Sequence, residues 1–284
     1  MQAKENCQGE CQWHEQSSAG KSKLCGLSRE QTMNLAMAVG KLLLKNGAET
    51  SRVEDSVTRL SYHFGVTDLN VFVTPTFIIL GDEYTEGKSI VCRIRSRSVN
   101  LNILSLVNDF TYGLNEWNYD YEETMAYLNE MMSMQPPYNK WLLCLASALG
   151  SACFAQLLGG NVYDFIAAFV TGGVAAVLLK LLAGYRPSAF WENVLAGAAI
   201  GATAILCCTL SNKCTMEAIT VGALMPFLPG LAFTNGLRDY MAGDLISGNS
   251  RVSEAVIFAM SIAIGLAISL GLWWNFGWDL WRWR

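Results

Sequence analysis

The sequence predicts an α-helical membrane protein that carries an N-terminal cytoplasmic α+β domain. Of its 284 residues 52% are hydrophobic and only 15% are charged, a composition too apolar for one ordinary soluble domain. Nearly all the charged residues come before Lys140, and long apolar stretches follow it. We therefore divide the chain into a disordered polar tail (1–27), a cytoplasmic domain (28–137) and a transmembrane domain (138–284).

The polar tail is rich in Gln, Glu, Gly and Ser. It has no apolar signal-peptide core, so we expect it to stay in the cytoplasm. Its Cys7, Cys11, Cys25 and His14 could supply zinc ligands, but the third cysteine is distant from the others. We therefore favour a tail without a metal. Other cysteines fall mostly in apolar stretches, where thiols behave as small hydrophobic side chains.

The cytoplasmic domain is expected to begin with two helices. Ser28 suits an N-cap before apolar residues at helical spacing, and Gly47 suits a helix stop. A second helix follows up to Gly65, with four charged residues near its start: Glu49, Arg52, Glu54 and Asp55. A charged helix start interacting with the helix dipole explains this pattern. The alternative is that these carboxylates serve acid–base chemistry or metal binding.

Two β-type segments follow at 69–80 and 89–97, and the glycine- and acid-rich connection between them suits a hairpin. One face of the second segment is basic, which we interpret as a solvated sheet face. Residues 100–114 and 121–134 return to helical spacing, and 135–137 form a proline-containing linker. The domain is therefore an antiparallel hairpin flanked by helices.

Five apolar stretches of about 20 residues are long enough to cross a bilayer. They run over 141–158, 162–183, 190–210, 215–233 and 252–274. Small residues recur in them, as in GGVAA and AGAAIGATA, and indicate close helix packing. Lys140, Lys180 and Arg186 fall on one side of these stretches. The positive-inside rule then predicts a multi-pass protein of the plasma (inner) membrane with its N-terminus in the cytoplasm.

The most informative stretch is 225–254, at the end of the fourth apolar segment. Pro226, Pro229 and Gly230 should break a membrane helix there, and broken helices beside charge mark transporter binding sites. We predict a substrate site for a small charged solute, built from Pro229, Gly230, Asn235, Arg238, Asp239 and Asp244. An arginine fork suits a carboxylate, and an aspartate suits an ammonium group or a coupling proton. The alternative is a helix end followed by a solvated polar loop.

The chain resembles the threonine/serine exporter family (ThrE type), in its short, YjjP-like form. The resemblance covers Ser28 to the C-terminus and rests on four stretches: GAETSRVED, VTPTFI, VNLNILSLVN and PGLAFTNGLRDYMAGDLISGNSRVSEA. It implies one subunit of a split exporter. Such an exporter moves threonine and serine, or succinate, and its second subunit is a small YjjB-like membrane protein.

Other function classes find less support in the sequence. No Lys/Arg stripe with interleaved aromatic residues suggests a nucleic-acid partner. No Walker A loop, nucleophile elbow or HExxH motif is present, so we expect no ATP, cofactor, metal or enzymatic activity. Two alternatives stay open. One is a membrane-anchored hydrolase-like enzyme using Glu49, Asp55 and His63, and the other is a non-transporting assembly subunit.

Overall fold

A computed structural model describes residues 27–82, 89–95, 97–116, 120–134, 138–182, 184 and 188–277. The polar tail with its cysteines, most of the connection after residue 82 and the linker at 135–137 lie outside the described residues. The chain divides into two compact units. The first joins the chain up to Gln135 with Asn235–Ser250, and the second joins Pro136–Thr234 with the chain from Arg251 onward. The sequence-based division had assigned 235–250 to the membrane domain.

Helix α2 (Arg29–Lys45) lies at the centre of the first unit. Ser28 is its N-cap residue. The Ser28 hydroxyl accepts a hydrogen bond from the backbone N–H of Gln31, and the Gln31 side chain accepts one from the backbone N–H of Ser28 in return. The chain turns at Gly47, whose φ of +93° favours glycine, and helix α3 (Thr50–His63) follows. The predicted helix start at Ser28 and stop at Gly47 are confirmed.

Three antiparallel strands form one sheet in the order β1 (Leu69–Thr74), β2 (Phe77–Asp82) and β3 (Ser89–Arg93). The segment expected as a single strand over 69–80 is therefore two strands. Pro75 and Thr76 form the turn between the paired residues Thr74 and Phe77. Proline has no N–H to give to a sheet ladder, so this position ends one strand and begins the next.

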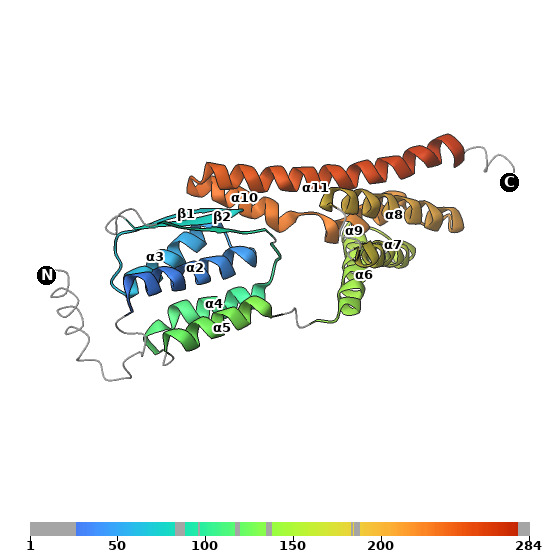
Figure 1. Cartoon of the computed structure of the whole chain (residues 1–284). Coiled ribbons are helices and arrows are strands. Elements are labelled where there is room, and N and C mark those ends of the chain that lie inside the picture. The colour runs from blue at the N-terminus through green and yellow to red at the C-terminus, as the bar shows by residue number, and fades with distance from the viewer. Residues whose placement is uncertain are drawn as a thin grey trace, which may run out of the picture. The chain divides into compact units, whose positions relative to one another are not determined.

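The first unit is built in layers. Figure 1 shows α2 and α3 between the sheet and the helices α4 (Leu101–Tyr112) and α5 (Tyr121–Ser133). Because α2 has neighbours on several sides, it is apolar around much of its circumference. The largest fully buried side chains of this core are Leu35, Leu42, Leu43, Leu44, Leu60, Ile78, Leu80, Phe110, Leu128 and Met131. The two helices predicted over 100–114 and 121–134 are confirmed.

The second unit contains the apolar helices α6 (Lys140–Leu157), α7 (Val162–Leu182), α8 (Ala189–Leu210), α9 (Met216–Leu224) and most of α11 (Leu245–Leu272). Among the described residues, four helices are long and apolar enough to cross a membrane, or up to five if a bent pair counts as one span. Glycine and alanine bring these helices close together. A Cβ added to Gly222 would lie 2.7 Å from Ala155, on α6. The predicted helical membrane fold with about five spans is confirmed.

The bent pair lies where the sequence predicts a helix break. Helix α9 is followed by the short 3-10 turn η2 (Met225–Phe227) and then by α10 (Gly230–Ala242). The angle between the segment Met216–Phe227 and α10 is 62°. Pro229 directly precedes α10, so its missing N–H falls at a helix start, where that donor has no partner inside the helix. Helix α10 starts in the second unit and ends in the first.

Candidate functional site

The candidate site lies in the first unit, where helix α10 contacts the start of helix α3. The first N–H groups of any helix lack partners inside that helix and need them from elsewhere. Glu49, the N-cap residue of α3, makes no capping bond with its own side chain. The N–H of Thr50, the first residue of α3, instead finds its acceptor on α10, 189 positions further along the chain.

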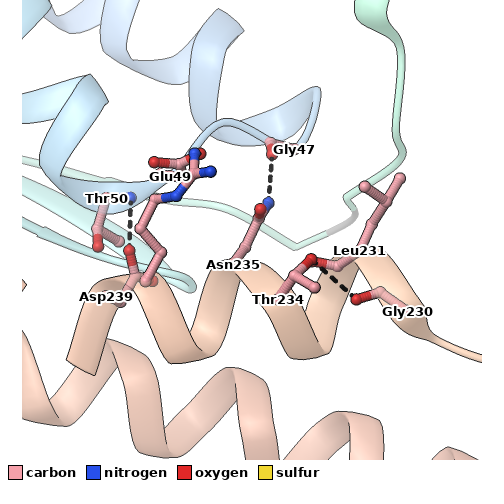
Figure 2. Close-up of polar contacts among 9 residues, drawn as sticks. Gly47, Glu49, Thr50, Gly230, Leu231, Thr234, Asn235 and Asp239 are labelled. Atoms are coloured by element: carbon pink, nitrogen blue, oxygen red, sulfur yellow. Dashed lines mark hydrogen bonds and ion pairs between the residues drawn. The ribbon is translucent and has the colours of Figure 1, made fainter. Parts of the chain in front are cut away.

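Two hydrogen bonds join α10 to the start of α3, and Figure 2 shows both. Asp239 Oδ1 accepts from the backbone N–H of Thr50 at 3.3 Å. Asn235 Nδ2 donates to the carbonyl oxygen of Gly47 at 3.2 Å. Asn235 and Asp239 are four residues apart, so they share one side of α10. Asp239 and Thr50 are both 0% exposed, which makes this contact a buried one.

An ion pair between Arg238 and Glu49 stands beside these hydrogen bonds. The side chain of Arg238 is 67% exposed and that of Glu49 is 16% exposed. Solvent screens a pair of this kind, so it contributes about 0–1 kcal/mol to stability. The guanidinium group of Arg238 is therefore held in place yet reachable from solvent.

The turn after α10 and the first residues of α11 each add one further contact. The hydroxyl of Thr50 donates to Asp244 Oδ2 at 3.5 Å, a long hydrogen bond. The buried hydroxyl of Ser247 donates to the carbonyl oxygen of Val73 in β1 at 3.3 Å. Residues 235–247 are thus attached both to α3 and to the sheet.

Glu54 brings another carboxylate to this region. Its Oε1 accepts a hydrogen bond from the backbone N–H of Val73 at 2.9 Å. Burial raises the pKa of Glu54, and the negative charges of Asp244, Asp55 and Asp239 raise it further, against the lowering effect of the Val73 hydrogen bond. The start of α3 therefore lies in an acidic environment.

The structure brings together two groups of residues that the sequence predicted separately. They are the motif residues Asn235, Arg238, Asp239 and Asp244, and the helix-start residues Glu49 and Glu54. Arg52 and Asp55 are exposed on α3. Pro229 and Gly230 lie at the helix break, in the second unit. Sequence reasoning missed Gly47 and Thr50 as contact residues, because only their backbone groups meet Asn235 and Asp239.

The residues of the enzyme alternative do not share one cavity. Asp55 and His63 line a groove along α3, whereas Glu49 is paired with Arg238 and does not line that groove. Within the described residues, no three His, Cys, Asp or Glu side chains are close enough to hold a metal ion.

Comparisons with known proteins agree with the resemblance. Residues 34–273 match the family model described as "Putative threonine/serine exporter" (ThrE). The chain is 23% identical to a "Probable threonine/serine exporter" of Mycobacterium tuberculosis, over 86% of this chain and 46% of the relative. It is 22% identical to the "Probable succinate transporter subunit YjjP" of Escherichia coli, over 86% of this chain and 95% of the relative. It is also 22% identical to the threonine/serine exporter of Corynebacterium glutamicum, over 84% of this chain and 51% of the relative.

No solved structure matches this chain. The chain spans about half the length of its mycobacterial and corynebacterial relatives and nearly the whole length of YjjP. The family match includes both units and every residue of the α3–α10 contact. With four to five apolar spans in the part of the chain that the structure describes and a family match over most of its length, this multi-pass membrane protein belongs to the ThrE family.

Proposed function

We propose that this chain is one subunit of a secondary exporter in the plasma (inner) membrane, with its N-terminal domain in the cytoplasm. Its cargo is a small carboxylate-bearing metabolite, either threonine and serine or succinate. The observation that carries the proposal is the broken pair α9–α10, which leads from an apolar segment directly into the charged motif. Interrupted membrane helices beside charged groups are a typical feature of transporter binding sites.

A second membrane subunit is supported by the name of one relative, the "Probable succinate transporter subunit YjjP". The two full exporters among its relatives are about twice as long as the matched region, and the relative of similar length is named as a subunit. We infer that a small YjjB-like membrane protein is the partner of this chain. The transport site is then formed together with that partner in the lipid bilayer, because transporter sites lie where two membrane repeats meet.

Arg238 is the candidate ligand for the carboxylate of the cargo. Its planar guanidinium group can hold a carboxylate through two parallel N–H···O bonds. Glu49 is paired with Arg238 in this state, so an incoming carboxylate has to displace that of Glu49. Since the Arg238 side chain is 67% exposed, this exchange requires no opening of the core.

Asp239 and Asp244 are the candidate partners of an ammonium group or of a coupling proton. Asp239 accepts the hydrogen bond of Thr50, so an ammonium group bound there would compete with the contact between α10 and α3. Cargo binding would then be linked to release of α10. For a dicarboxylate such as succinate, the two aspartates would repel the cargo unless they were protonated, which would itself provide proton coupling.

A non-transporting assembly subunit is the second candidate. It is favoured by the finding that Asn235, Arg238, Asp239 and Asp244 each contact the first unit's own residues. In that case the motif would serve only to attach α10 to the domain. The enzyme alternative has no comparable support, because its three residues are divided between two places.

Efflux of labelled threonine, serine and succinate tests these proposals, in cells expressing this chain alone, a YjjB-like partner alone, or both. We expect export only with both chains. Arg238→Gln should abolish it, whereas Glu49→Gln and the exposed control Arg95→Gln should preserve it. Export that survives Arg238→Gln but is lost with Glu49→Gln would overturn the assignment of the site. Absence of export in every arrangement would favour the assembly subunit.

A further inference from the structure

A groove with a volume of about 660 Å³ runs along helix α3 in the first unit. Helix α3 contributes two adjacent rows of side chains to it. Residues 54, 58 and 62 form one row and 55, 59 and 63 the other, because positions four apart lie one above the next on a helix. Residues 69–71, at the start of β1, complete the lining.

The charges of the groove are separated along the helix. The carboxylates Glu54 and Asp55 come first, Arg59 follows one turn after Asp55, and His63 follows one turn after Arg59. Four residues of helix advance by about 6 Å. The ammonium and carboxylate groups of an α-amino acid sit on one carbon, and each hydrogen-bond partner lies about 3 Å beyond its group. One turn between Asp55 and Arg59 therefore suits an amino acid placed between them.

Arg59 is fixed in position but its charge is not neutralised. Its guanidinium carbon lies 3.9 Å from the centre of the Tyr112 ring, and Nη2 donates to the Thr111 hydroxyl at 3.5 Å. Among the described residues, no carboxylate is within ion-pair distance of Arg59, and its buried Nε has no hydrogen-bond acceptor. Stacking on an aromatic ring positions a cation without cancelling its charge. A carboxylate bound at the outer guanidinium nitrogens would compensate it.

Asp55 provides the matching negative end. It is exposed, and it has no hydrogen-bond or ion-pair partner in the part of the chain that the structure describes. Glu54 is directly beside it, half-buried, with one carboxylate oxygen bonded to Val73. Two neighbouring carboxylates attract a cationic group more strongly than one.

We propose that this groove binds a zwitterionic α-amino acid, with its ammonium group at Asp55 and Glu54 and its carboxylate at Arg59. The site is separate from Arg238, so the proposal goes beyond export and does not depend on it. Glu54 links the groove to α10, because it lies one turn after Thr50, which donates hydrogen bonds to Asp239 and Asp244. An ammonium group at Glu54 would offset the mutual repulsion of these carboxylates. The bound amino acid would thereby strengthen the contact between α10 and α3 and act as a regulatory ligand.

Equilibrium dialysis of labelled L-threonine against the purified full chain, in detergent or nanodiscs, tests the proposal. We expect threonine to bind. Two analogues should bind with an affinity lower by about tenfold or more: 3-hydroxybutyrate, which lacks the ammonium group, and threonine methyl ester, which lacks the carboxylate. Asp55→Asn and Arg59→Gln should each cause a loss of about tenfold or more. The matched surface variants Glu130→Gln and Arg95→Gln should bind threonine like the parent chain.

Several outcomes would overturn the proposal. The first is that threonine does not bind, and the second is that 3-hydroxybutyrate binds as tightly as threonine. The third is that Arg238→Gln abolishes threonine binding while Asp55→Asn and Arg59→Gln retain it. The last result would move the amino acid to the α10 site. Asp55 is exposed, so Asp55→Asn tests the groove without disturbing the core. Arg59→Lys keeps the charge, and partial retention of binding by it would separate loss of the ligand contact from misfolding.

Discussion

The carboxylate of Asp239 accepts a hydrogen bond from the backbone N–H of Thr50, the first residue of helix α3, although 189 residues separate them in the sequence. The unpaired N–H groups and the dipole at a helix start stabilise a negative charge placed there. Helix α3 therefore receives from α10 a cap that its own N-cap residue does not supply. A change at either residue should affect both helices.

Replacing Asp239 should weaken the start of α3. Asp239→Ala removes the acceptor and should lower the free energy of unfolding by about 1–2 kcal/mol, the usual effect of losing a helix cap. Asp239→Asn keeps an acceptor but loses the charge, so we expect a smaller decrease, of about 0.3–1 kcal/mol. Denaturant unfolding of the full chain in detergent measures both, with the exposed substitution Glu130→Gln as control. Equal, negligible effects of both Asp239 variants would contradict the capping role.

Arg238→Gln should have little effect on stability. Its partner Glu49 is largely buried but Arg238 is 67% exposed, so the loss should stay below about 1 kcal/mol. The same unfolding measurement, made beside the export assay, separates a binding role from a structural one. Lost export with normal stability supports cargo binding. A loss of several kcal/mol would instead make Arg238 a structural residue of the α3–α10 contact.

Glu54 should make stability depend on pH. Its pKa in the folded state is raised above the ordinary value of 4.5, mainly by burial. The folded state therefore holds its proton more tightly than the unfolded state. The resulting stabilisation is complete below pH 4.5 and is lost as the pH rises through the folded-state pKa.

Glu54→Gln removes this titration and keeps an oxygen that can accept from Val73. Unfolding of both proteins between about pH 4 and pH 7 should show the parent chain losing stability relative to the variant as the pH rises. If the free energies of unfolding of the parent chain and of Glu54→Gln differ by the same amount across that range, Glu54 titrates alike in the folded and unfolded states, which would contradict the prediction.

Glycine at position 265 should be required for packing in the second unit. A Cβ there would overlap the carbonyl oxygen of Val194 on α8, so Gly265→Ala should destabilise the protein by about 1–3 kcal/mol. Gly271, in the same helix, has nothing within 4 Å of an added Cβ. Gly271→Ala should therefore be neutral or stabilising by up to about 1 kcal/mol. Thermal unfolding in detergent compares the two, and equal effects would contradict the close contact between α8 and α11.

Much of the fold could be predicted from local signals. The capping box at Ser28, the turn at Gly47 and the break at Pro229 each depend on residues within a few positions of one another. The apolar stretches predict membrane helices because a bilayer demands about 20 apolar residues in a row. The extra strand boundary at Pro75 was missed, since the surrounding apolar residues read as one continuous strand.

The sequence by itself determined the class of protein, the division into polar and apolar parts, and the family to which the motifs belong. Only the tertiary structure decided that the motif at 235–244 lies against the start of α3, with Asp239 at Thr50 and Arg238 at Glu49. Helix periodicity and capping are set by neighbouring residues, so a sequence reveals them. A contact across 189 residues depends on how the whole chain packs. In this contact the donor is the backbone N–H of Thr50, and a backbone group carries no sequence signal.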